Sequence, residues 1–277
     1  GERIWDTNSF AQVNYTQTFG KFTTLNNLKY AFYRTHYVNN DDKQIKIDNL
    51  YKQKEVYFSS ANEYVLFPWW HVSAAYDFQW NTLDADVYGF AQPDRFSNML
   101  SVATAFDLGR LKAQASVLAT FIHDSLKGQQ SPSDKHVLTP AAFVSYTLVR
   151  GLSARAFYKQ SYRMPTFNDL YYADMGNSKL NPERVTQYNL GLLFSKRGGG
   201  LVSEMRFSGD AYYNYVKDKI VAYPKGQQFR WTMLNLGEVE IKGVDAVLNA
   251  LFTLGKLEVT TKFQYTYQKA IDITDPA

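Results

Sequence analysis

The sequence contains no cysteine among its 277 residues. It can therefore form no disulfide bond, hold no metal through a thiolate and use no cysteine nucleophile. It also lacks any run of about 18 or more apolar residues, which excludes a membrane-spanning helix. Its 30 basic and 26 acidic residues almost cancel, and no basic cluster concentrates the excess. We therefore expect no nucleic-acid partner.

Aromatic residues are abundant, with 21 Tyr, 19 Phe and 5 Trp. Tyr and Trp favour bilayer interfaces, because each has an apolar ring and a polar group that reaches water. A soluble β-sandwich with an aromatic core is the alternative that composition leaves open. The pattern along the chain decides between the two.

The segment from Leu152 to Lys196 shows that pattern most clearly. Two stretches with strict alternation flank an irregular loop that opens at Arg163 and closes at Glu183. In the first stretch one face carries Leu152, Ala154, Ala156 and Tyr158, and the other carries Ser153, Arg155, Lys159, Ser161 and Arg163, with Phe157 among them. Period-two alternation places successive side chains on opposite faces of a sheet. An apolar outer face with a charged inner face is typical of a membrane-spanning β-barrel.

The joins between alternating segments are sorted by length. We expect about twelve strands, near residues 8–18, 23–37, 54–66, 70–81, 95–107, 110–123, 136–149, 152–163, 184–196, 201–216, 230–253 and 256–269. Short, mostly glycine-containing turns alternate with long polar joins near 38–53, 82–94, 124–135, 164–183 and 217–229. Short turns on one side and long loops on the other are typical of a bacterial outer-membrane barrel.

We therefore predict an all-β fold: a transmembrane, antiparallel, up-and-down β-barrel. The parity of the apolar residues changes around Gly243, which predicts a β-bulge there. The chain starts without a signal peptide, and its last strand leads into what reads as another long loop. Because an open sheet edge in lipid leaves backbone groups unpaired, we expect residues 1–277 to be a fragment of a larger barrel, with the closing strands absent.

Three ordered motifs stand out along the chain. The first runs from Tyr158 through Arg163-Met164-Pro165 to Tyr171, and the second is Gly176-Asn177-Ser178-Lys179-Leu180-Asn181-Pro182-Glu183. The third is Asn235-Leu236-Gly237 followed by Gly243-Val244-Asp245. In residue type and order, these motifs resemble those of a known family, the TonB-dependent outer-membrane receptors. Together they touch about a quarter of the chain, and the remainder agrees in pattern only.

The resemblance implies a barrel of about 22 strands with a separate N-terminal plug domain inside it. It implies outer-membrane lipid around the barrel, a small-molecule ligand, and energy delivered to the plug by a periplasmic TonB complex. The function expected on this basis is TonB-coupled uptake of a bulky, scarce nutrient, a cobalamin or a ferric siderophore. The plug and a TonB-box segment do not occur in residues 1–277.

Two groups of residues are candidates for ligand binding. Arg155, Lys159 and Arg163 share one strand face and could attract an anionic ligand or hold an acidic plug surface, or they could be ordinary charges balanced by Glu204 and Asp210. The loop after Arg163 carries Met164, Phe167, Tyr171, Tyr172 and Met175. These side chains could stack on a bulky ligand or pack the loop against its neighbours.

Other kinds of site find little support. Asn39, Asn40, Asp41, Asp42 and Asp48 offer oxygen ligands of the type that Ca²⁺ prefers, but the twelve-residue calcium-loop pattern is missing. The four histidines show no paired ligand spacing, so we predict no metal site and no cofactor. An enzyme would need a catalytic set at one rim, yet adjacent His123, Asp124 and Ser125 point to opposite faces. A passive porin or an adhesin barrel remains as an alternative.

Overall fold

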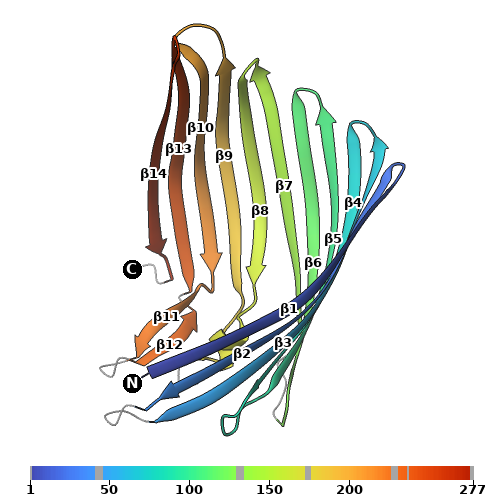
Figure 1. Ribbon diagram of the computed structural model, residues 1–277, viewed down its shortest axis with the longest axis vertical. Coiled ribbons are helices and arrows are strands. Elements are labelled where there is room, and N and C mark those ends of the chain that lie inside the picture. Colours follow the sequence, from blue (N-terminus) through green and yellow to red (C-terminus); the bar gives the residue numbers. More distant parts are fainter. Residues whose placement is uncertain are drawn as a thin grey trace.

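The computed structural model describes residues 2–40, 46–128, 134–171, 176–225, 230–235 and 237–274. Twelve antiparallel strands form one sheet in the order β1-β2-β3-β4-β5-β6-β7-β8-β9-β10-β13-β14, and β11 pairs only with β12. Each strand of the large sheet therefore lies beside its neighbour in the sequence, except where β10 meets β13. This is the predicted up-and-down architecture, seen as a curved, open sheet (Figure 1). Among the described residues, no helix is long and apolar enough to cross a bilayer.

The strands of the large sheet have 12 to 21 residues and are long compared with the roughly 9–11 residues that a tilted strand needs to cross a bilayer, whereas β11 and β12 have only 6 residues each. Their bounds are β1 (Glu2–Phe19), β2 (Phe22–Asn39), β3 (Ile47–Phe67), β4 (Trp70–Ala85), β5 (Pro93–Leu108), β6 (Leu111–Leu126), β7 (Lys135–Val149), β8 (Leu152–Arg163), β9 (Glu183–Arg197), β10 (Val202–Lys217), β11 (Ile220–Lys225), β12 (Arg230–Asn235), β13 (Glu238–Leu254) and β14 (Leu257–Asp272). The single described helix, α1, spans Phe167–Tyr171.

The sorting of the joins by length is confirmed. At one end, most strands are joined by two-residue turns, and Gly20, Gly109, Gly151 and Gly255 adopt positive φ there. Glycine takes this conformation without a steric cost, so it suits tight hairpins. The longer connections, the helix α1 and the β11–β12 hairpin all lie at the opposite end (Figure 1).

The pairing register places mostly polar residues on one face of the sheet and mostly apolar residues on the other. We call the face that carries Glu55, Asn81, Arg95, Asp124 and Lys159 the inner face, and the opposite one the outer face. On the outer face, small and apolar residues lie opposite one another across β6 and β7, as in the pairs Ala115–Ala142 and Ala113–Val144. Aromatic rings stack near one short turn on this face, where Trp70 and Phe106 have centroids 5.7 Å apart.

Two details differ from the sequence-based expectation. The single strand expected over 230–253 is two strands, and β11 lies in what was expected to be a loop at 217–229. The hairpin formed by β11 and β12 extends beyond the main sheet, because β10 already pairs directly with β13 from Lys217–Glu238 onward. The hairpin therefore does not need one apolar face toward lipid. Its sequence lacks the alternation that would have distinguished its strands from a loop.

The β-bulge predicted at Gly243 is absent, because the register with both neighbouring strands is continuous there. The parity changes for another reason. Outer-face positions Val244 and Leu248 are apolar, whereas Glu240 and Lys242, on the same face nearer the loop end, form an ion pair at 2.7 Å. Gly243 itself lies under the phenol of Tyr212, which occupies the space of a β-carbon. The register shifts that do occur lie beside short turns, at Val65/Phe67, Thr147/Val149 and Val202/Glu204.

One ion pair on the inner face crosses over a whole strand. Arg155 of β8 donates to both carboxylate oxygens of Asp210 of β10, at 3.1 and 2.5 Å. The residue between them on β9 is Gly191, and any β-carbon there would collide with the Asp210 carboxylate and the Arg155 guanidinium. The glycine therefore makes the pair possible.

Candidate functional site

The loop that follows β8 is held in a defined shape by its own side chains. Helix α1 starts with a reciprocal cap: the Thr166 amide donates to the Asp169 carboxylate at 2.9 Å, and the Asp169 amide donates to the Thr166 hydroxyl at 3.2 Å. This arrangement is a capping box in which aspartate replaces the usual glutamate. Asp169 is 8% exposed and also accepts a hydrogen bond from Arg163 at 3.1 Å.

The chain then returns against the same helix. The amide of Asn177 donates to the Asp169 carbonyl at 2.8 Å. A β-carbon on Gly176 would lie 2.8 Å from backbone atoms of Leu170 and Tyr171, so only glycine fits against α1 here. Close packing against α1 therefore explains why the second sequence motif has a glycine at position 176.

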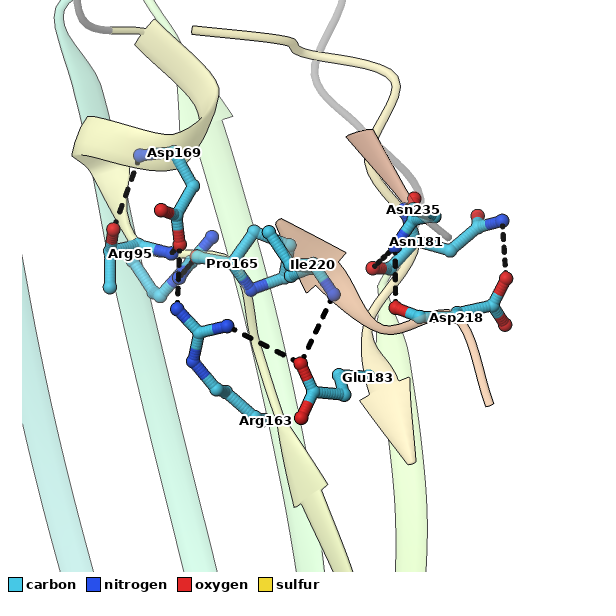
Figure 2. A network of polar contacts seen from close by, with 10 residues as sticks. Arg95, Arg163, Pro165, Asp169, Asn181, Glu183, Asp218, Ile220 and Asn235 are labelled. Atoms are coloured by element: carbon cyan, nitrogen blue, oxygen red, sulfur yellow. Dashed lines mark hydrogen bonds and ion pairs between the residues drawn. The ribbon is translucent and has the colours of Figure 1, made fainter. Parts of the chain in front are cut away.

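Arg95 of β5 fastens this loop to the inner face of the sheet. Its guanidinium makes two hydrogen bonds to Asp124 of β6, at 2.7 and 2.8 Å, and both side chains are almost fully buried. A third bond, at 2.7 Å, reaches the carbonyl of Pro165 (Figure 2). The guanidinium carbon also lies 5.1 Å from the centre of the Phe167 ring, a cation–π distance.

Apolar packing completes the attachment of the loop. Phe167, Tyr51 and Leu83 form a buried cluster, and Tyr171, Phe90 and Val87 pack against it. The rings of Phe167 and Tyr171 have centroids 6.2 Å apart. Burial raises the pKa of the Tyr171 phenol above its ordinary value.

The loop and the inner face together line a cavity of about 820 Å³ that is partly open to solvent. Its walls come from β3 to β8, and Met164, Thr166, Phe167 and Asn168 of the loop close one side, which we call the roof. The walls present mainly uncharged hydrogen-bonding groups, among them Gln53, Gln79, Asn81, Ser97, Thr120 and Ser161. Met99, Leu118 and Ile122 add apolar surface. This volume is within the range of small-molecule binding sites.

The charges that line the cavity are mostly paired. Glu55 accepts from Lys29 at 2.9 Å and from Gln79 at 3.2 Å, and Arg95 is paired with Asp124. Lys159 also lines the cavity, and no carboxylate lies within ion-pair distance of it among the described residues. As far as the described residues show, the cavity is therefore close to neutral, and Lys159 is the one lining cation without an ion-pair partner.

The structure brings together some of the residues predicted from the sequence. Met164, Phe167 and Lys159 line the cavity, whereas Tyr171 packs behind the roof. Arg163 binds Asp169 and, at 3.5 Å, Glu183. Arg155 lies outside the cavity and pairs with Asp210, one of the two balancing acids considered; Glu204 instead pairs with Arg197 and Arg206. Tyr172 and Met175 lie outside the described residues.

Sequence reasoning missed Arg95 and Asp124. A signal was available, because the two residues lie equally far from the two-residue turn at Gly109-Arg110, and such a turn sets the register of its hairpin. Within the described ranges, no three His, Asp or Glu side chains are placed to hold a metal ion. His123 pairs with Asp134 at 2.7 Å and Asp124 with Arg95, so these neighbours in sequence serve different faces.

Comparisons with known proteins agree with this fold. Residues 2–277 match a family model described as "TonB dependent receptor-like, beta-barrel". The Vitamin B12 transporter BtuB of Vibrio vulnificus is 24% identical over 204 residues, which span 72% of this chain and 30% of that protein. BtuB of Photobacterium profundum is 29% identical over 124 residues, or 44% of this chain and 19% of that protein.

Solved structures give the same picture. The FrpB iron transporter of Neisseria meningitidis (F5-1 variant) has a TM-score of 0.72 at 11% identity, over 96% of this chain and 45% of that one. The Serratia marcescens hemophore receptor HasR has a TM-score of 0.72 at 13% identity, over 96% and 49%. At such identities the likeness shows the fold. The chain spans less than half of each of these relatives.

Proposed function

This chain belongs to the TonB-dependent receptor β-barrel family, and from that membership we propose that it forms part of a bacterial outer-membrane receptor for energy-coupled uptake of a bulky, scarce nutrient. The intact receptor would hold a plug domain against the inner face and would receive energy through that plug from a periplasmic TonB complex. Beside the family membership, the observation that supports ligand uptake is the cavity of about 820 Å³ at the long-loop end of the inner face.

The chemistry of the cavity favours a ligand with many hydrogen-bonding groups and little net charge. Amide and hydroxyl side chains line it, its acids and Arg95 are already paired, and Lys159 is the single cation available among the described residues. A polyanionic ligand needs several free cations, because a buried charge without a partner costs several kcal/mol. We therefore propose a corrinoid or an uncharged ferric hydroxamate as the ligand, in preference to a ferric tris-catecholate. The likeness to two vitamin B12 transporters supports the corrinoid.

Binding and uptake measurements on the intact receptor test this proposal. Purified receptor is titrated with cyanocobalamin, with a neutral ferric trihydroxamate and with a ferric tris-catecholate. We expect saturable binding of one of the first two, and weakening of that binding by Thr120→Leu. Preferential binding of the tris-catecholate would contradict the ligand class while leaving the receptor class intact.

Uptake distinguishes the receptor from a passive pore or an adhesin. Cells that express the receptor should accumulate the bound ligand only while the inner membrane is energised and a TonB protein is present. Accumulation that persists after a protonophore collapses the proton gradient would favour the passive pore. Binding of neither ligand, together with adhesion to a surface, would favour the adhesin.

A further inference from the structure

The β11–β12 hairpin is joined to the cavity roof by a continuous chain of polar contacts. Glu183, at the start of β9, is the link between them. One of its carboxylate oxygens accepts from the Ile220 amide of β11 at 3.2 Å and from Arg163 at 3.5 Å (Figure 2). Arg163 in turn binds Asp169, which caps helix α1. The helix carries Phe167, part of the cavity roof.

A second set of contacts fastens the base of the hairpin to the returning half of the same loop. Asn235, the last residue of β12, exchanges two hydrogen bonds with the backbone of Asn181, at 2.8 and 3.1 Å. The Asn177 side chain donates to the Met233 carbonyl at 2.9 Å. These contacts join residues more than fifty positions apart in the sequence.

The backbone at the hairpin base is shaped for these contacts. Asp218, between β10 and β11, has a φ of 56°, a left-handed conformation that aspartate tolerates better than most residues. This conformation accompanies a contact in which the Asp218 carbonyl accepts from the Asn235 side chain at 2.6 Å. The Asn235 side chain therefore connects the two ends of the hairpin base to each other and to the loop between α1 and β9.

We propose that Glu183 and Asn235 are positioning residues that make the β11–β12 hairpin and the cavity roof move as one body. The inference rests on the proposed function only in treating the cavity as the ligand site. Neither residue lines the cavity. A contact made at the hairpin is thus transmitted to Phe167 through Glu183, Arg163 and Asp169, and movement of the roof displaces the hairpin in turn.

Spin-label distances in the intact receptor test the mechanical link without any ligand. Residues 1–277 contain no cysteine, and any cysteine elsewhere in the intact receptor is first replaced by serine. Tyr223→Cys and Lys179→Cys then place labels on the hairpin and on the loop, both at exposed positions. We expect a narrow distance distribution in this background. Asn235→Ala and Glu183→Ala should each broaden it about twofold, and Glu183→Gln, which keeps an acceptor oxygen, should restore most of the narrow form. Glu204→Ala, which removes a carboxylate from β10 far from the loop, is the matched control.

Ligand affinity is the second measurement. It should stay unchanged if Glu183 only stabilises its own surroundings and does not position the roof. With cyanocobalamin as the probe, Glu183→Ala should weaken binding about tenfold, as expected for loss of one hydrogen bond to a charged group, and Glu183→Gln by much less. Distances that stay narrow in both alanine variants would overturn the inference. If the unmodified receptor does not bind cyanocobalamin, the corrinoid assignment fails, and the distance measurement still decides the positioning role.

Discussion

At the scale of single residues, the Arg95–Asp124 pair is the contact on which the cavity depends most directly. Both side chains are nearly buried, and Arg95 also holds the carbonyl of Pro165, which lies between the roof residues Met164 and Thr166. Removing one partner leaves the other charge buried and unpaired, which costs about 3–5 kcal/mol. Removing both partners avoids that penalty.

We therefore expect Arg95→Met to lower the free energy of unfolding of the receptor by about 3–5 kcal/mol. The double variant Arg95→Met/Asp124→Leu should recover much of the loss. Urea unfolding of the intact receptor in lipid measures both. Equal losses in the single and double variants would show that the Pro165 contact, and not the charge pair, accounts for the stability.

Gly176 supports a second prediction at this scale. A methyl group there would meet the backbone of α1 at 2.8 Å, and backbone cannot move aside as a flexible side chain can. Gly176→Ala should loosen the loop and make residues 164–182 several-fold more sensitive to protease added to whole cells. Gly199→Ala, in a turn with open space around it, should leave the cleavage rate unchanged. Equal protection of both variants would contradict the packing argument.

At the scale of elements, the sequence predicted the large sheet well and the loop end poorly. Lipid on one side and polar contents on the other force strict alternation, and the two-residue turns mark where each hairpin reverses. Beyond the bilayer that constraint ends. Glu240 and Lys242 can then occupy outer-face positions, and β11 and β12 can form a hairpin with no periodic signature.

The same reasoning explains which parts of the site were predictable. Met164, Phe167 and Lys159 could be proposed from the motif and from the face of β8. The Arg95–Asp124 pair follows from the position of one short turn. The Glu183–Ile220 contact could not be predicted from the sequence. The β9–β10 hairpin and the connection from β10 to β11 separate the two residues, and no turn motif in that connection fixes how β11 lies against β9.

The β11–β12 hairpin should be dispensable for assembly of the sheet. Lys217 and Glu238 lie opposite each other at the ends of β10 and β13, so an Asn-Gly turn can replace residues 218–237 and close the hairpin. We expect the shortened receptor to reach the outer membrane and to show unchanged heat-modifiable mobility on a gel. Its affinity for the ligand should fall, because Asn181 and Glu183 lose their contacts with Asn235 and Ile220, and the roof is then held less firmly. Failure to assemble would show that the hairpin is needed for folding.

At the scale of the whole molecule, the two faces of the sheet predict opposite responses to the same substitution. Ala115 lies on the outer face opposite Ala142, and Gln114 beside it lies on the inner face. Ala115→Lys should destabilise the receptor by roughly 2–4 kcal/mol if it lies near the bilayer midplane, because the ammonium group must leave water. Gln114→Lys should cost much less. Unfolding measurements in lipid vesicles compare the two, and equal costs would contradict the assignment of the faces.

The ion pair that crosses β9 above Gly191 has a consequence for how such receptors change over evolutionary time. Arg155, Gly191 and Asp210 lie on three different strands, yet none of them can be replaced alone without loss. A side chain in place of Gly191 displaces the ion pair. Loss of either charged residue leaves the other partly buried, without a partner, beside the space above the glycine. Descendants of this chain should therefore keep or exchange all three together. Among related receptors, the three positions should therefore vary together, although they lie on three strands and not on one adjacent pair.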